Sequence, residues 1–181
     1  MTAQRALVLG GSASGKSNFA EALATATGKD RIYIATAQVF DAEMADKVAR
    51  HQQMRGQGWH TVEAPLDLGP ALAEARADQV VLLDCATMWL SNHMLAEHNL
   101  DRAEAALMAA LADCAAQVII VSNELGLSVV PDNVLARRFR DAQGRLNQRL
   151  AAQADLVALV MAGLPVALKG TLPDALKGTL P

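Results

Sequence analysis

The stretch Gly10-Gly11-Ser12-Ala13-Ser14-Gly15-Lys16-Ser17 matches the phosphate-binding pattern G-x-x-x-x-G-K-[S/T]. An apolar run at residues 6–9 precedes it, and a segment typical of a helix, 16–27, follows it. Glycines let backbone N–H groups turn toward phosphate oxygens, and the N-terminus of the following helix adds a positive dipole end. We expect Lys16 to contact the β- and γ-phosphates and the Ser17 hydroxyl to bind Mg²⁺. The alternative is a glycine turn before a helix with a chance Lys-Ser pair.

The pattern of the whole chain predicts an α/β fold. Short continuous apolar runs, typical of strands buried on both faces, alternate with helical segments, which favours a mostly parallel, doubly wound sheet of P-loop NTPase (RecA-like) architecture. The predicted strands are residues 6–9, 32–34, 80–83, 118–121 and 156–160, with a weaker one at 61–63. The predicted helices are residues 16–27, 41–56, 68–77, 101–115 and 133–154. Ligands of such sheets bind at the carboxyl ends of the strands.

Length and composition indicate one enzyme-sized domain. The 181 residues are 52% hydrophobic and 19% charged, which excludes a disordered chain. The net charge of −3 argues against a nucleic-acid partner, and no apolar stretch is long enough for a membrane span. Two cysteines, Cys85 and Cys114, form no disulfide framework or metal motif, so we expect a cytoplasmic protein with reduced thiols.

The C-terminus contains a short repeat. Residues 166–173 and 174–181 match at seven of eight positions. Two Gly/Pro-containing copies are too few for a solenoid, so we predict one catalytic domain at residues 1–169 and a loosely held tail at 170–181.

Asp84 ends the apolar run at residues 80–83. P-loop proteins place a carboxylate that organises Mg²⁺ at such a point. Many strands end in Asp, so the assignment depends on the phosphate loop upstream. Together these residues predict a nucleotide-binding phosphotransferase, without naming the acceptor.

A second constellation follows residues 32–34. Here Ala35-Thr36-Ala37 precede a predicted helix that carries His51 between Arg50 and Arg55. His51 and Arg55 share a helix face at spacing i,i+4. Nearby cations would keep the imidazole neutral and nucleophilic and would attract phosphates. On spacing alone, an exposed histidine on a solvated basic face is the stronger interpretation.

Two further polar groups lie where ligands of α/β sheets bind. Asn123 and Glu124 follow the run at residues 118–121, and the alternative for them is a turn with a helix-capping Asn. The last predicted helix carries several arginines and Asp141, for which a solvated face with ion pairs is the simpler interpretation.

Taken in order, these segments resemble a known family. GGSASGKSNFAE, YIATAQVFDAEMADKVARHQQMRGQGWHTVEAP, VVLLDCATMWLSN, VIIVSNELGLSVVP and RRFRDAQGRLNQRLAAQADLVALVMAGLP resemble the bifunctional adenosylcobinamide kinase / adenosylcobinamide-phosphate guanylyltransferases of cobalamin biosynthesis. The resemblance covers about residues 6–169. One departure is Ala13, where these proteins commonly have an arginine.

The resemblance implies two reactions. ATP or GTP phosphorylates adenosylcobinamide, and GTP then donates GMP to adenosylcobinamide phosphate through a guanylylated histidine, which corresponds to His51. It also implies a homotrimer, while Mg²⁺ at Ser17 and Asp84 and the catalytic role of Lys16 follow from the phosphate-loop motif. The implied nucleotide contacts are Gly10, Gly11, Ser12, Ala13, Ser14, Gly15, Lys16, Ser17, Ala35, Thr36, Ala37, Gln52, Gln53, Met54, Arg55, Glu63 and Asp84.

Two other functions stay open at this point. The chain could be a P-loop small-molecule kinase without nucleotidyl transfer, or a nucleotide-dependent switch or ATPase subunit. Retention of label from α-labelled GTP separates the first from the bifunctional enzyme, and transfer to cobinamide excludes the second.

Overall fold

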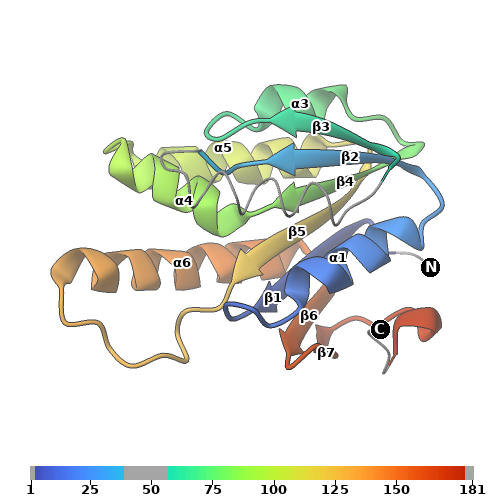
Figure 1. The fold of residues 1–181 in the computed structure, drawn as a ribbon. Helices are drawn as coiled ribbons and strands as arrows, with labels where there is room; N and C mark the ends of the chain where they lie inside the picture. Colours follow the sequence, from blue (N-terminus) through green and yellow to red (C-terminus); the bar gives the residue numbers. More distant parts are fainter. Residues whose placement is uncertain (1–2, 39–56, 178–181) are drawn as a thin grey trace.

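The computed structural model describes residues 3–38 and 57–177, and these form one seven-stranded sheet (Figure 1). The strands lie in the order β3-β2-β4-β5-β1-β6-β7. All neighbouring pairs are parallel except β6 and β7. The strand bounds are β1 Arg5–Gly10, β2 Asp30–Ala35, β3 Trp59–Glu63, β4 Gln79–Asp84, β5 Gln117–Asn123, β6 Leu156–Met161 and β7 Leu164–Lys169.

Helices cover both faces of the sheet, which confirms the predicted α/β class. α1 packs through Phe19 and Leu23 on the face formed by Val8, Ile119 and other alternate strand residues. The other face is covered by helices that contribute Leu72, Trp89, Leu107 and Leu146 among others. The helix bounds are α1 Lys16–Thr25, α3 Gly69–Glu74, α4 Ala86–Leu95, α5 Leu100–Asp113 and α6 Val134–Gln153. No helix in these described ranges has the length and hydrophobicity that crossing a bilayer requires.

Alternation along the strands decides which side chains face α1. In β5, Ile119 and Val121 belong to the α1 cluster, whereas Val118 and Ile120 belong to the cluster on the other face. In β4, Val80 and Leu82 face α1 in the same way. Since side chains alternate along a strand, Asp84 and Asn123 at the strand ends lie on the α1 face.

Two elements differ from the sequence expectation. α4 was not predicted. Its buried residues, which include Trp89, Leu90 and Asn92, lie around most of the helix, so the sequence shows no apolar stripe with the helical period. β7 was not predicted either, since it contains Pro165. As the edge strand beside β6, it tolerates a proline that a central strand would not. The predicted helix at residues 41–56 lies outside the described residues.

The segment after β7 is held more firmly than the repeat suggests. Leu172 is 9% exposed and belongs to the apolar cluster under α1, and Leu176 of the short 3₁₀ helix Asp174–Leu176 packs against it. Gly170 has φ +74, and a side chain there would meet the backbone of Asp155, so the chain can turn back toward the core only with glycine at this position. The first copy of the repeat therefore contributes a core residue.

Leu172→Ala should lower the free energy of unfolding by about 2 kcal/mol, because it removes buried apolar contacts and leaves a cavity. The matched control is Leu168→Ala on β7, where the native side chain is 59% exposed. Thermal unfolding should show a fall of roughly 4–8 °C for the first variant and almost none for the second. Equal melting temperatures would mean that Leu172 contributes no packing in solution.

Candidate active site

The phosphate loop connects the central strand β1 to α1. β1 ends at Gly10, and Gly15 precedes α1 with φ 90, a left-handed conformation that glycine adopts without strain. A side chain at Gly10 would meet the Ser14 hydroxyl and would lie 2.7 Å from the Val160 carbonyl oxygen. The sequence motif thus folds into the strand–loop–helix arrangement that presents backbone N–H groups to an anion.

Lys16 lies at the first turn of α1 and reaches back over the loop. Its Nζ donates a hydrogen bond to the Gly11 carbonyl oxygen at 3.0 Å. Burial lowers the pKa of Lys16, and electrostatic interactions with Cys85 and Asp84 act in the opposite direction. The lysine therefore interacts electrostatically with the end of β4.

Asp84 is the last residue of β4, on the α1 face. Its Oδ2 accepts a hydrogen bond from the Tyr33 hydroxyl of β2 at 3.0 Å. Sequence reasoning did not assign Tyr33 a role, although its place in the apolar run of β2 put a hydroxyl on the same face as Asp84. This bond holds the carboxylate in one orientation at the carboxyl edge of the sheet.

The residues present fit a magnesium ion. Mg²⁺ is typically bound by one or two protein groups, with phosphates and waters completing its shell. Asp84 supplies a carboxylate and Ser17 a half-buried hydroxyl in the first turn of α1. Within residues 3–38 and 57–177 no cluster of three or more His, Cys, Asp or Glu forms a metal cage. The donor set suits a metal that arrives with a nucleotide.

Thr36 ties the ends of β2 and β4 together. Its Oγ1 donates to the Cys85 carbonyl oxygen and accepts from the Cys85 backbone N–H, both at 2.8 Å. Its backbone N–H bonds to the Asp84 carbonyl oxygen at 3.2 Å, and its side chain is fully buried. Burial raises the pKa of the Cys85 thiol to about 12, so this cysteine is an inert part of the junction. Ala35 and Ala37 flank Thr36 and are half-buried.

Glu63 ends β3 at the far edge of the sheet. It is paired with Ala35, which is paired in turn with Asp84, so the three residues form a row across β3, β2 and β4. Four inter-strand steps separate β3 from β1, which is roughly 19 Å. Glu63 is exposed there and cannot contact the same phosphate group as Lys16.

The remaining predicted site residues divide into two groups. Ser12 and Ala13 are exposed in the loop, where Ala13 has φ 54, and the Ser14 carbonyl oxygen accepts from the Gly163 N–H at 2.9 Å. The second group, in and around the predicted histidine helix, lies outside the described residues and comprises His51, Gln52, Gln53, Met54 and Arg55.

The end of β5 carries a polar network that sequence reasoning did not anticipate. Ser122 Oγ donates to Asn147 Oδ1 at 2.7 Å, and Gln143 Nε2 donates to both Ser122 Oγ and Asn147 Oδ1 at 2.9 Å. All three side chains are buried in the contact between β5 and α6. The spacing of Gln143 and Asn147, i,i+4, was a signal for one shared helix face.

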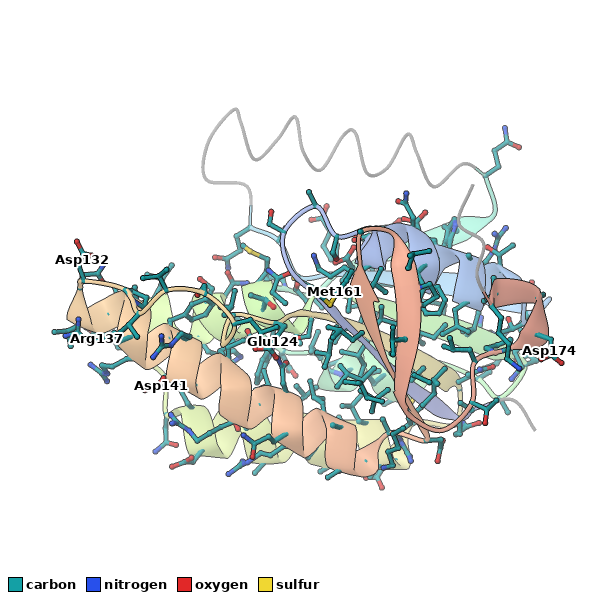
Figure 2. The ribbon with its side chains drawn as sticks, turned by 90° about the horizontal axis from the view of Figure 1, so that it is seen from below. Glu124, Asp132, Arg137, Asp141, Met161 and Asp174 are labelled. Carbon is teal, nitrogen blue, oxygen red and sulfur yellow. The ribbon has the colours of Figure 1, made fainter. Side chains whose placement is uncertain are left out.

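The alternative for Asn123 and Glu124, a turn with a helix-capping Asn, holds in part, because a turn does follow β5 but Asn123 caps neither α4 nor α6. Asn133 caps α6 by accepting from the Ala136 N–H, and the Cys85 sulfur caps α4. Glu124, labelled in Figure 2, instead accepts from the Gly126 N–H at 2.6 Å within its own turn.

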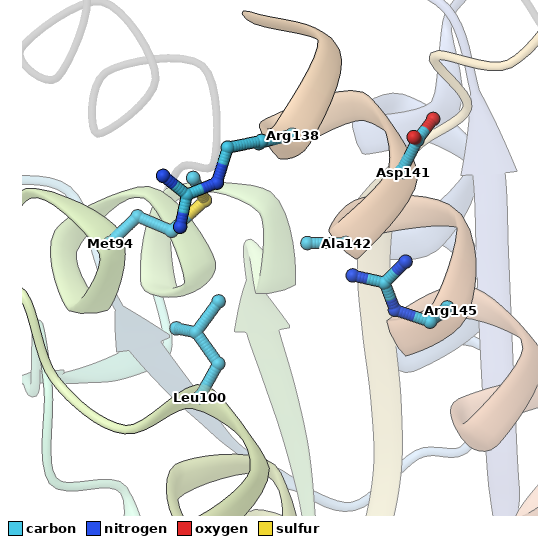
Figure 3. A pocket seen from close by; sticks show the side chains of 6 residues that line it. All are labelled: Met94, Leu100, Arg138, Asp141, Ala142 and Arg145. Carbon is cyan, nitrogen blue, oxygen red and sulfur yellow. The ribbon is translucent and has the colours of Figure 1, made fainter. Parts of the chain in front are cut away.

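A cavity of about 220 Å³ lies elsewhere, between α4, α5 and α6. Figure 3 shows the Arg138 and Arg145 side chains at this cavity and the Asp141 carboxylate directed away from Met94 and Leu100. None of the predicted site residues within ranges 3–38 and 57–177 lines it. The phosphate loop and Asp84 therefore form a separate site.

Comparison with known proteins gives one consistent family. Residues 6–168 match the family model described as cobinamide kinase / cobinamide phosphate guanyltransferase. The bifunctional adenosylcobalamin biosynthesis protein CobP of Pseudomonas aeruginosa is 44% identical over 92% of this chain and 98% of its own length. The bifunctional adenosylcobalamin biosynthesis protein CobU of Salmonella typhimurium is 40% identical over 90% of this chain and 98% of its own length.

The similar solved structures support the fold but carry no information about the function. A type III secretion system ATPase of pathogenic bacteria aligns with TM-score 0.51 and 9% identity over 91% of this chain and 56% of its own. A Pyrococcus horikoshii protein of structural project PH0250 aligns with TM-score 0.54 and 7% identity over 99% of this chain and 93% of its own. The first likeness agrees with the predicted P-loop NTPase architecture.

Asp84→Asn should reduce Mg²⁺-dependent turnover of a nucleoside triphosphate by about 100-fold while changing nucleotide affinity little, because the loop backbone still holds the phosphates. A Mg²⁺ titration of the rate beside calorimetric nucleotide binding measures the two effects. Asp78→Asn is the matched control, since Asp78 precedes β4 at the opposite edge, exposed and paired with Arg76. Equal damage to rate and affinity would indicate a structural role for Asp84.

Proposed function

Because the chain belongs to the cobinamide kinase / cobinamide phosphate guanyltransferase family, we propose that it carries out both reactions on adenosylcobinamide. It phosphorylates adenosylcobinamide with ATP or GTP and then transfers GMP from GTP to adenosylcobinamide phosphate, a late step in adenosylcobalamin assembly. The observation that carries this proposal is the match over nearly the full length of this chain and of the bifunctional relatives.

The phosphate loop supports the kinase step. Lys16, Ser17 and the loop N–H groups hold the triphosphate, and Asp84 with Ser17 binds the Mg²⁺ that neutralises its developing charge. The bond between the γ-phosphorus and the β-phosphate oxygen breaks, and its electron pair stays on the diphosphate. A new bond forms to the substrate hydroxyl oxygen, whose proton is released to water.

The guanylyl transfer is assigned to His51. A neutral imidazole nitrogen attacks the α-phosphorus of GTP, pyrophosphate leaves with the electron pair, and the imidazole loses its N–H proton to water. A phosphate oxygen of adenosylcobinamide phosphate then attacks the same phosphorus, the P–N bond electrons return to the ring nitrogen, and the imidazole regains a proton from water. The covalent intermediate divides the transfer into two steps: a neutral nucleophile attacks GTP in the first, and imidazole is the leaving group in the second.

The proposed nucleotide site extends along the carboxyl edge of the sheet. Residues 35–37 and Glu63 continue from Asp84 away from the loop, in the row formed by β4, β2 and β3. With its phosphates at Lys16, a nucleotide lying along this edge would bring its base toward Ala35, Thr36, Ala37 and Glu63. We assign these residues, with residues 52–55, to guanine-nucleotide recognition.

We further propose a cytoplasmic homotrimer. Both cysteines are free thiols, which suits a reducing compartment. Leu164, Val166 and Leu168 of the edge strand β7 are each more than half exposed, and an apolar edge strand of this kind favours association with another chain. Adenosylcobinamide and its phosphate are the remaining partners, and no nucleic acid takes part.

Incubation with α-labelled GTP should label the protein on His51, through a bond that is labile in acid and stable in base. His51→Ala should abolish label retention and guanylyl transfer while leaving phosphorylation of adenosylcobinamide intact. Denaturing gels and peptide mapping locate the label, and a separate assay with γ-labelled ATP follows the kinase step.

Two variants serve as controls for this assay. Lys16→Ala should lose both reactions, because it removes a charge that contacts the phosphates in each of them. His60→Ala, on the exposed part of edge strand β3, should retain both. A kinase that never retains α-label would be a P-loop kinase without nucleotidyl transfer, and a protein that transfers nothing to cobinamide would fit a switch or ATPase subunit instead.

Light scattering coupled to size exclusion should give a mass near three times the 19.1 kDa of the chain. The physical reason is the exposed apolar surface that assembly would remove from water. A mass that stays at one chain across protein concentrations in the micromolar range would contradict the trimer.

A further inference from the structure

We infer that Asn123 is a substrate-contacting residue of the phosphate site, and that its side-chain NH₂ donates a hydrogen bond to an oxygen of the γ-phosphoryl group. This inference deepens the proposed function, because it adds a residue to the same site. It rests on where β5 ends, on which way its last residues face, and on the hydrogen bonds that hold them.

The strand order places Asn123 between the two parts of the site. β5 lies between β1, which leads into the phosphate loop, and β4, which ends in Asp84. Asn123 is paired with Gly10, the first residue of the loop, whereas Asp84 is paired with Val121. Asn123 thus lies roughly 7 Å farther along the strand direction than Asp84, toward the position of a ligand on the loop.

Alternation directs Asn123 and its neighbour Ser122 to opposite faces. Val121, two residues earlier, packs in the cluster under α1, so Asn123 is on the α1 face with Lys16. Ser122 is on the other face, where it bonds to Asn147 of α6. Only one of these two adjacent polar residues therefore faces the phosphate loop.

The backbone of Asn123 is fixed on both sides. Its N–H donates to Thr87 Oγ1 at 2.8 Å, and its carbonyl oxygen accepts from Asn147 Nδ2 at 3.0 Å. The next residue, Glu124, donates its N–H to the Gly10 carbonyl oxygen at 3.1 Å. Three elements, α4, α6 and β1, thus hold this single residue against the start of the loop.

The carboxamide itself forms no hydrogen bond with the part of the chain that the structure describes. Its Oδ1 is enclosed by protein and accepts no hydrogen bond there. Enclosure of the oxygen leaves the NH₂ group as the end that a ligand can reach. An N–H donor complements the oxygens of a phosphoryl group, which are acceptors only.

The test measures how well the protein distinguishes a triphosphate from a diphosphate. Affinities for ADP and for the β,γ-imido analogue of ATP, both with Mg²⁺, are determined by calorimetry on the full chain. In Asn123→Ala the preference for the triphosphate should shrink at least about tenfold, because one hydrogen bond to a charged group is lost. Affinity for ADP should stay within about twofold of wild type, since ADP has no γ-phosphate.

Two further variants make the result specific. Asn123→Asp keeps the size of the side chain but places a carboxylate beside the phosphates, so its preference for the triphosphate should fall further than that of Asn123→Ala. Asn99→Ala is the matched control, since the Asn99 side chain accepts a hydrogen bond from the Arg102 N–H at the start of α5, and this variant should leave the preference unchanged. Thermal unfolding of each variant establishes that it is folded, and Asn123→Asp decides the case if Asn123→Ala does not fold.

The outcomes also separate this inference from the proposed function. The kinase rate constant of Asn123→Ala should fall about 100-fold at saturating substrate, as expected when a donor to the transferring group is removed. A wild-type protein without kinase activity would overturn the proposed function, yet the binding preference would still test Asn123. An unchanged preference in both Asn123 variants, or an equal loss in Asn99→Ala, would overturn the role of Asn123.

Discussion

The parallel hydrogen-bond ladder of β4, β5 and β1 is the constraint on which the site depends. Each strand arrives at the same edge pointing the same way, so Asp84, Asn123 and Gly10 meet there although they are far apart in sequence. A shift of one residue in any of these strands would send its terminal side chain to the opposite face. Both faces of each strand are buried, so close packing of individual side chains against the helices holds the register.

The buried polar groups at the strand ends fix the geometry of this edge at a cost in folding free energy. An enclosed acceptor without a donor costs about 1–3 kcal/mol, and Asn123 Oδ1 and Gln143 Oε1 both lack one among the described residues. Apolar residues at these positions would pack without that cost. The polar side chains instead fix the geometry of short segments, as Thr36 does when it joins the backbone of Cys85 to the end of β2.

Much of the fold could be predicted from local patterns, and the limits have physical causes. The phosphate loop, the five central strands and the helix after the loop each have a signal within about ten residues. α4 has none, because a helix buried on most sides has no polar face. The site was predictable at Lys16 and Asp84, where a motif carries the chemistry. Tyr33 and Asn147 act through partners 51 and 24 residues away, and no local pattern encodes such pairs.

The bond from Gly163 to the Ser14 carbonyl oxygen joins the phosphate loop to the turn between β6 and β7. A ligand that displaces Ser14 must either break this bond or move the turn with it. If nucleotide binding changes the affinity of β7 for another molecule, that molecule changes the nucleotide affinity by the same factor. Through this single peptide N–H, a shift of Ser14 would reach the edge strand, and contact with the apolar face of β7 would reach the phosphate loop in return.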